Sequence, residues 1–150
     1  MKAQDPSNRD PSTLTCENWM SRDMITAEPL DSVGHARELL QQHRINELPI
    51  VKDGRLVGIA TDRDLRIKEY VPQSAHEIPL ETVMSHGVIT MGPLSTLTDA
   101  ASVLRRRRIG SVPIVDGHRL VGIVTRSDIL EAFIACEGTR AGAKPLAQEH

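Results

Sequence analysis

Two short motifs place a hydroxyl and a carboxylate three residues apart, Thr61 with Asp64 and Thr125 with Asp128. A carboxylate offers two acceptor oxygens and a threonine hydroxyl can donate or accept, so each motif can hydrogen-bond a polar ligand. At the start of a helix, the same pattern is typical of a capping box, in which the two side chains satisfy backbone N–H groups. An isolated Thr-x-x-Asp therefore indicates a helix start, and only its surroundings can indicate a binding site.

Side chains typical of catalysis are scattered along the chain. The six histidines lack the close spacing of metal ligands, and neither Cys16 nor Cys136 lies in the sequence context of a nucleophile. The sequence has no glycine-rich loop of the kinds that bind phosphate or a dinucleotide. We therefore interpret the chain as a binding module and not an enzyme, with no cofactor or metal required and both cysteines as free thiols.

The composition limits the partners of the chain. Its 150 residues carry a net charge of −2 with a pI near 6.3, and aromatic residues make up only 2%. This composition lacks both a basic field for nucleic acid and the aromatic platforms of a single-strand binder. The basic run Arg105–Arg108 lies at a predicted helix end, where the helix dipole favours cations and explains the run without nucleic acid. Without an apolar segment long enough for a membrane span or a secretory signal, we expect a cytoplasmic protein with no membrane partner.

The two Thr-x-x-Asp motifs lie in a duplicated sequence. Residues 18–65 recur without a gap 64 positions later, so that Leu48-Pro49-Ile50-Val51 aligns with Val112-Pro113-Ile114-Val115. An internal repeat of this regularity predicts two copies of one small fold. Because each copy alone would bury little surface, we expect the pair to fold as a unit.

Each copy predicts the order β-α-β-β-α, from apolar residues at helical spacing, short β-rich runs and an Asp53-Gly54 hairpin turn. The expected elements of the first copy are a strand at 24–26, a helix from 29–32 to 43, strands at 48–51 and 56–60, and a helix from 61 to 70. Those of the second copy are a strand at 88–90, a helix at 95–107, strands at 112–115 and 120–124, and a helix at 125–136. The expected domains are a flexible tail at 1–15, repeats at 16–70 and 80–136 joined by a linker at 71–79, and a flexible tail at 137–150.

The Leu/Val-Pro-Ile-Val strand, the Leu-Val-Gly-Ile strand and the Thr-x-x-Asp helix start all occur twice at constant spacing. This tandem pattern resembles a pair of cystathionine-β-synthase (CBS) domains, also called a Bateman module, over residues 16–136. Among such pairs, the sequence is most similar to short stand-alone bacterial forms, including those resembling acetoin-utilisation regulatory proteins. The resemblance implies an α/β (α+β) fold of two β-α-β-β-α repeats related by pseudo-two-fold symmetry, with a ligand cleft between them.

The resemblance also implies which residues hold an adenosyl ligand. In the family, the aspartate of the motif accepts hydrogen bonds from both ribose hydroxyls and the threonine contacts ribose or phosphate, roles that fall on Asp64 with Thr61 and on Asp128 with Thr125. The residue before the Leu-Pro strand packs on adenine, and the first short strand supplies backbone hydrogen bonds. The residues in these positions are Ile45, Ile109, Met24, Ile25, Val88 and Ile89. Both isoleucines end amphipathic helices, so burial in the core alone is the alternative interpretation.

The sequence departs from the phosphate-binding members of the family, which often have His or Arg just before the Leu-Pro pair. The equivalent positions hold Asn46-Glu47 and Gly110-Ser111, and Glu47 would repel a phosphate unless its side chain turned away. An arginine can grip a phosphate with two hydrogen bonds, and Arg63 and Arg126 lie within the Thr-x-x-Asp motifs. We favour Arg63, with a solvated surface position as the alternative for each arginine.

These residues lead to the hypothesis of a regulatory sensor whose ligand is AMP, ADP or ATP, with S-adenosylmethionine and NAD as alternatives. A ligand between the repeats can shift their relative position and so signal to a separate, unidentified effector protein. The family usually associates as dimers of tandem pairs, so we expect a homodimer through the helices that follow the two motifs. The candidate contacts are Ile67, Tyr70, Ile129, Leu130, Phe133 and Ile134. The competing hypotheses are a ligand-free scaffold that kept the fold and, less favoured, nucleic-acid binding through Arg105–Arg108.

Overall fold

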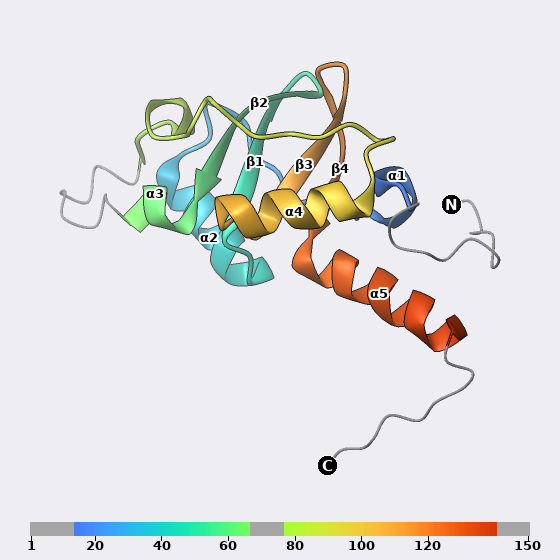
Figure 1. Cartoon of the computed structure of the whole chain (residues 1–150). Helices are drawn as coiled ribbons and strands as arrows, with labels where there is room; N and C mark the ends of the chain where they lie inside the picture. The colour runs from blue at the N-terminus through green and yellow to red at the C-terminus, as the bar shows by residue number, and fades with distance from the viewer. Residues whose placement is uncertain (1–13, 67–76, 141–150) are drawn as a thin grey trace, which may run out of the picture.

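The chain forms a four-stranded antiparallel sheet with helices, in a computed structural model that describes residues 14–66 and 77–140, the last two without their side chains. The helices are α1 (Cys16–Trp19), α2 (Val33–His43), α3 (Asp62–Arg66), the 3-10 helix η4 (Leu80–Thr82), α4 (Leu97–Arg107) and α5 (Arg126–Arg140). The strands are β1 (Glu47–Lys52), β2 (Arg55–Thr61), β3 (Ser111–Asp116) and β4 (Arg119–Thr125). Figure 1 shows the two hairpins standing together above α4 and α5.

The sheet has the strand order β1-β2-β4-β3, in which each repeat supplies one hairpin and the second strands of the hairpins meet. The first hairpin turn has positive φ at Asp53 and Gly54, as a type I′ turn requires, and the second has it at Gly117, as in a type II′ turn. The pairing registers of the two hairpins are identical after the 64-residue shift, including one bulge in each. The predicted tandem repeat and mixed α+β fold are therefore confirmed.

Helices α2 and α4 are capped in the same way at both ends. Ser32 and Thr96 each accept a hydrogen bond, at 3.1 Å, from the N–H three residues later, as N-cap side chains do. Arg44 and Arg108 end the helices in the left-handed conformation with φ of 55°. The predicted helices are confirmed, and their C-caps direct the chain from each helix into the following strand.

The brief strands predicted at 24–26 and 88–90 are wrong. These segments form no strand pairing, and the residue that follows each of them makes one isolated parallel bridge. The bridges join Ala27 to Ile50 and Met91 to Ile114. A proline two residues further on in each repeat has no N–H to donate, and the chain then turns towards the next helix, so the pairing stops.

Two further boundaries differ from the sequence-based expectation or extend beyond the described residues. Helix α5 continues to Arg140 instead of ending near residue 136, because Gly138 does not adopt the positive φ that ends many helices. The helix predicted from 61 to 70 is described as far as Arg66. Its remaining residues, with Ile67 and Tyr70, lie outside the described residues, as do 1–13, 71–76 and 141–150.

Two hydrophobic cores form, and each contains a segment from the other repeat. The core built on α4, α5, β3 and β4 also contains Cys16 and Met20 from the beginning of the first repeat, and Leu14 from the segment that was expected to be a flexible tail. The core built on α2, α3, β1 and β2 contains Leu80 of η4, from the beginning of the second. Figure 1 shows α1 lying on the β4 side of the molecule, away from the other elements of its own repeat. This exchange ties the two repeats together and forms the clefts at their junction.

Candidate functional site

Two clefts lie at the junction of the repeats. Cleft A has a volume of about 560 Å³ and is lined chiefly by residues 61–63 between β2 and α3, 87–89 before α4, and 108–111 between α4 and β3. Cleft B has a volume of about 630 Å³ and is lined chiefly by residues 125–127 between β4 and α5, 23–25 before α2, and 44–47 between α2 and β1. The residues common to both linings are Asn46, Glu47, Gly110 and Ser111.

The two clefts are copies of one composite site. Apart from Arg66 in cleft A and Ser21 in cleft B, the residues of one lining map onto the other by the 64-residue shift. In each cleft the strand–helix junction comes from one repeat, and the segment before the long helix comes from the other. Volumes of several hundred cubic ångströms are typical of small-molecule sites. A molecule bound in either cleft would contact both repeats.

Backbone pairing between the repeats produces this crossed arrangement. Ser21 and Ile123 exchange two N–H to oxygen hydrogen bonds of 2.8 and 3.0 Å. Ser85 and Ile59 exchange the equivalent pair at 2.8 and 2.9 Å. Each bridge anchors the segment that follows it against the second strand of the other repeat, and that segment then lines the cleft.

The structure divides most of the predicted site residues between the two clefts. Cleft A contains Thr61, Arg63, Val88, Ile89 and Ile109. Cleft B contains Thr125, Arg126, Met24, Ile25 and Ile45. The motif of one repeat therefore faces the apolar residues of the other, a grouping that local sequence patterns could not reveal.

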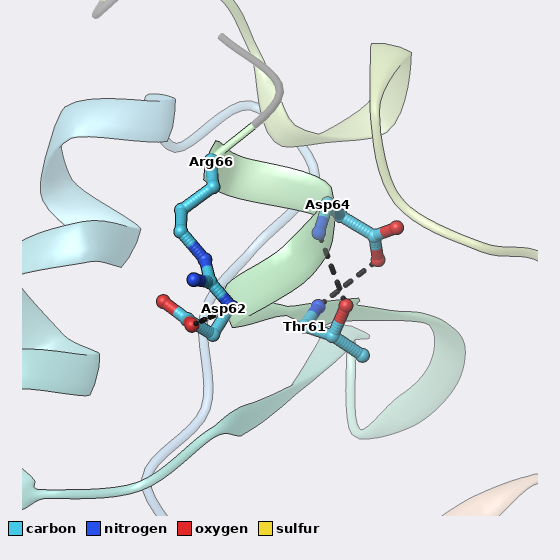
Figure 2. Close-up of polar contacts among 4 residues, drawn as sticks. All are labelled: Thr61, Asp62, Asp64 and Arg66. Carbon is cyan, nitrogen blue, oxygen red and sulfur yellow. Dashed lines mark hydrogen bonds and ion pairs between the residues drawn. The ribbon is translucent and has the colours of Figure 1, made fainter. Parts of the chain in front are cut away.

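Asp64 and Thr61 form a capping box at the start of α3 (Figure 2). The Thr61 N–H donates to Asp64 Oδ2 at 3.0 Å, and the Asp64 N–H donates to Thr61 Oγ1 at 3.1 Å. Asp62 and Arg66 form an ion pair of 2.9 Å beside it. Asp64 is not among the lining residues, but its carboxylate binds the N–H of one and so lies directly behind the wall of cleft A. Its Oδ1 points away from Thr61 and has no hydrogen-bond partner among the described residues.

Asp128 makes more hydrogen bonds than Asp64 and is more deeply buried. Its Oδ2 accepts from the Thr125 N–H at 2.8 Å and from the Thr125 hydroxyl at 3.0 Å, while its Oδ1 accepts from the Ser21 hydroxyl at 3.0 Å. Its side chain is only 7% exposed and does not line cleft B. Neither carboxylate is among the lining residues of a cleft, because each of them caps its own helix.

Glu47 has a role that the sequence analysis missed. Its Oε1 accepts a hydrogen bond from the Gly110 N–H and its Oε2 accepts one from the Ser111 hydroxyl, both at 3.0 Å. Glu47 and Ser111 are equivalent under the 64-residue shift, so this contact joins corresponding positions of the two repeats. The sequence repeat could have predicted this contact, because equivalent residues of two repeats related by a pseudo-two-fold axis can meet at that axis. The carboxylate places one negative charge in the wall that both clefts share.

Five exposed arginines border the clefts. Arg63, Arg66 and Arg108 line cleft A, and Arg44 and Arg126 line cleft B. The Arg126 guanidinium donates to the carbonyl of Ile109 at 3.5 Å, at the limit of a hydrogen bond. Arg63 has no such contact with another described residue, so its guanidinium is available to an anion in cleft A.

Both thiols of the described residues are buried. Neither Cys16 nor Cys136 forms a disulfide, and both are buried in the same core. Burial, with a smaller effect of the negative charge of Asp99, raises the pKa of Cys16 to about 11, so its thiol stays protonated at neutral pH. Residues 14–66 and 77–140 contain no cluster of three or more His, Cys, Asp or Glu that could hold a metal ion. No helix within these residues is long and apolar enough to cross a membrane.

The fold and the site together define a class, namely a tandem α+β repeat protein with two composite clefts at the junction of its repeats. The sequence matches the CBS domain family twice, over residues 16–68 and 80–135. The chain therefore belongs to the CBS domain family. The resemblance seen in the sequence motifs is confirmed.

Two relatives show how the family uses this unit. The CBS domain-containing protein YhcV of Bacillus subtilis is 32% identical over 113 residues, which span 75% of this chain and 81% of YhcV. An inosine-5'-monophosphate dehydrogenase of Korarchaeum cryptofilum is 35% identical over 114 residues, which span 75% of this chain but only 23% of that enzyme. Most of the dehydrogenase therefore has no counterpart in the matched region.

Solved structures share the fold over most of the chain. A proposed acetoin utilization protein, AcuB of Vibrio cholerae, has a TM-score of 0.79 and 29% identity, covering 89% of this chain and 99% of AcuB. The CBS domain pair of protein MJ0100 in complex with 5-methylthioadenosine and S-adenosyl-L-methionine has a TM-score of 0.68 and 34% identity, covering 81% and 96%. CBSX2 in complex with AMP has a TM-score of 0.73 and 25% identity, covering 81% and 96%.

Proposed function

We propose that this chain is a regulatory sensor that binds an adenosyl compound between its repeats and signals to a separate partner protein. The observation that carries the proposal is the composite construction of the clefts, whose walls come from both repeats. Similar CBS pairs bind AMP in one case, and 5-methylthioadenosine with S-adenosyl-L-methionine in another. We take AMP, ADP and ATP as the first ligands to test, with S-adenosylmethionine and NAD as alternatives.

In cleft A the predicted residues provide the three kinds of contact that such a ligand needs. Val88, Ile89 and Ile109 offer an apolar slot for the adenine faces and backbone groups for its polar edge. Asp64 Oδ1 stands behind the Thr61 wall as an acceptor for a ribose hydroxyl. Arg63 is the cation for a phosphate.

A bound ligand regulates by favouring one arrangement of the repeats over another. It can do so only to the extent that it binds that arrangement more tightly, and contact with both repeats supplies this difference. The ligand-dependent change is read by a separate effector protein. We place both proteins in the cytoplasm, a reducing compartment that suits a chain whose two cysteines form no disulfide.

We further propose that the sensor works as a homodimer of tandem pairs joined through α5. Leu130, Phe133 and Ile134 are each more than half exposed, and their spacing places them on one face of α5. Beside them an apolar cavity of about 650 Å³, lined by Leu104, Ile129 and Leu130 among others, lies between α4 and α5. A second copy that presents the same face would cover this surface symmetrically.

Calorimetric titration with AMP, ADP, ATP, S-adenosylmethionine and NAD tests the proposed function. We expect saturable binding of at least one of them, at least tenfold weaker in Asp64→Ala, because the ribose loses its acceptor. The matched control is Asp116→Ala, which removes an exposed carboxylate at the end of β3 that lines neither cleft. The capping bonds of both aspartates favour the competing scaffold function, and failure of all five compounds to bind would support it.

A further inference from the structure

Clefts A and B differ at the atom that would receive the ribose. Asp128 Oδ1 already accepts the Ser21 hydroxyl at 3.0 Å, and the side chain is 7% exposed. Asp64 is partly exposed, and its Oδ1 has no hydrogen-bond partner in the described part of the chain. Ser85 occupies the position equivalent to Ser21, yet it makes no such bond to Asp64. A ribose in cleft B must displace the Ser21 hydroxyl from a buried carboxylate, whereas a ribose in cleft A displaces no protein group.

The charges of the two linings differ in the same direction. Cleft A is lined by Arg63, Arg66 and Arg108 against Glu47 and Asp62. Cleft B is lined by Arg44 and Arg126 against Asp23 and Glu47. Cleft A therefore has one positive charge in excess, and cleft B has none. Gly87 and Arg63 of cleft A stand where cleft B has Asp23 and Ser127, and each of these differences makes cleft A more positive by one charge. Asp62 of cleft A stands where cleft B has Arg126, which offsets both, so the excess comes from Arg66, whose equivalent position holds Leu130.

The cations themselves are also placed differently. The Arg126 guanidinium of cleft B donates to the Ile109 carbonyl, while Arg63 of cleft A makes no hydrogen bond to a described residue. A phosphate in cleft B would compete with that carbonyl and would lie near the added charge of Asp23. The hydrogen bonds, the charges and the positions of the arginines thus all favour phosphate and ribose binding in cleft A over cleft B.

Building on the proposed function, we propose that the two clefts are unequal: cleft A is the site for a phosphorylated adenosyl ligand, and the Ser21–Asp128 hydrogen bond closes cleft B to it. The chain then binds one such ligand, not two. We expect cleft B to bind AMP at least tenfold more weakly than cleft A.

Calorimetry with AMP gives the first test, through the number of molecules bound per chain. We expect one, with affinity at least tenfold lower in Asp64→Asn and within twofold of the native value in Asp128→Asn. The variant Ser21→Ala frees Asp128 Oδ1 and should reveal a second, weaker binding event, while its matched control Ser85→Ala should still bind one AMP. Two equal sites in the native chain, or loss of binding in Asp128→Asn but not in Asp64→Asn, would overturn the proposal.

Methyl NMR of isoleucine locates the ligand without relying on variants that alter helix caps. AMP should shift the methyl signals of Ile89 and Ile109 in cleft A and leave those of Ile25 and Ile45 in cleft B unchanged at equimolar ligand. Shifts confined to the cleft B pair, or of equal size in both pairs, would refute the inequality while leaving the sensor function intact. Absence of any shift and of any heat with all five ligands would instead refute the sensor function itself.

Discussion

The carboxylate of Glu47 links the two repeats by hydrogen bonds, and it also places a negative charge in the wall that both clefts share. It accepts one hydrogen bond from the Gly110 N–H and one from the Ser111 hydroxyl, both groups of the other repeat. No cation pairs with it among the described residues, so its negative charge acts on whatever enters the clefts. In a phosphate-binding protein, the hydrogen bonds of Glu47 stabilise the fold while its charge repels the ligand. A substitution at residue 47 can separate the two effects.

Replacement of Glu47 by glutamine should strengthen AMP binding and weaken the fold. Loss of one like charge near the phosphate should favour binding by about 1 kcal/mol, or roughly fivefold. The amide cannot accept both hydrogen bonds equally well, so the free energy of unfolding should fall by about 1 kcal/mol. Calorimetry and urea unfolding measure the two effects, with Glu38→Gln on the exposed surface of α2 as the control. If Glu47→Gln lowered the stability but left the AMP affinity unchanged, Glu47 would have a structural role only, and the proposed repulsion of the phosphate would be contradicted.

The contrast between Asp64 and Asp128 shows what residue patterns can and cannot predict. The Thr-x-x-Asp spacing is local, so it predicted the helix starts and the capping alternative correctly. The hydroxyl that occupies Asp128 belongs to Ser21, 107 residues away, and only tertiary packing brings the two together. The same holds for the bond between Glu47 and Ser111, which no local pattern announces.

At the scale of elements, the exchanged segments α1 and η4 position the clefts. The bridges made by Ser21 and Ser85 bring each segment onto the second strand of the other repeat, where Gly58 and Gly122 leave room for it. A Cβ on Gly58 would lie 2.6 Å from Met84 Sδ and 3.0 Å from the Ser85 carbonyl oxygen, and one on Gly122 would overlap Met20. These glycines are needed for close approach and not for a turn.

Substitution of Gly58 by alanine should destabilise the protein by about 1 to 3 kcal/mol, the usual cost of an overpacked core. It should also displace the segment before α4 that lines cleft A, and therefore weaken AMP binding. Gly92→Ala is the control, because a Cβ there meets no neighbouring atom within 4 Å. Urea unfolding and calorimetry give both readouts. Equal stability of the two variants would contradict the packing account.

The regular helices and hairpins were predictable because their signals are local: caps, helical spacing and turn residues. The strands predicted at 24–26 and 88–90 were wrong because apolar, β-branched residues there suit a cleft wall as well as a strand. Residues 24–25 and 88–89 bridge no neighbouring strand, and only the Val88 N–H is engaged locally, donating to the His86 carbonyl at 2.9 Å, so the other backbone groups of these residues can face a ligand. The two segments wrongly predicted as strands thus line the candidate clefts, beside junctions of helices and strands that were predicted correctly.

At the scale of the whole molecule, the exchange of segments makes the relative position of the repeats a property that a ligand can influence. Each core includes residues from both repeats, so a shift of one repeat relative to the other would alter the packing of both cores. The sequence duplication predicted two similar sites, but it could not predict their inequality, which depends on which side chains meet across the junction. Leu130, Phe133 and Ile134 on the outer face of α5 are exposed in the single chain.

The dimer proposal predicts that Phe133→Glu converts the protein to a monomer. A charge on the apolar face of α5 would have to be buried in the interface without a partner, which is strongly unfavourable. Leu30→Glu is the control, because Leu30 is also exposed but lies in the turn before α2. Light scattering should give a dimer for the native chain and the control. A native monomer at all concentrations would contradict the proposal.

A crystal structure of the protein grown with AMP tests the central claim most directly. We predict electron density for one nucleotide in cleft A, with the base against Ile89 and Ile109 and a ribose hydroxyl at Asp64 Oδ1. The phosphate should lie within reach of Arg63. Density outside the junction of the repeats, or clefts that stay empty at an AMP concentration that saturates the protein in solution, would contradict the account.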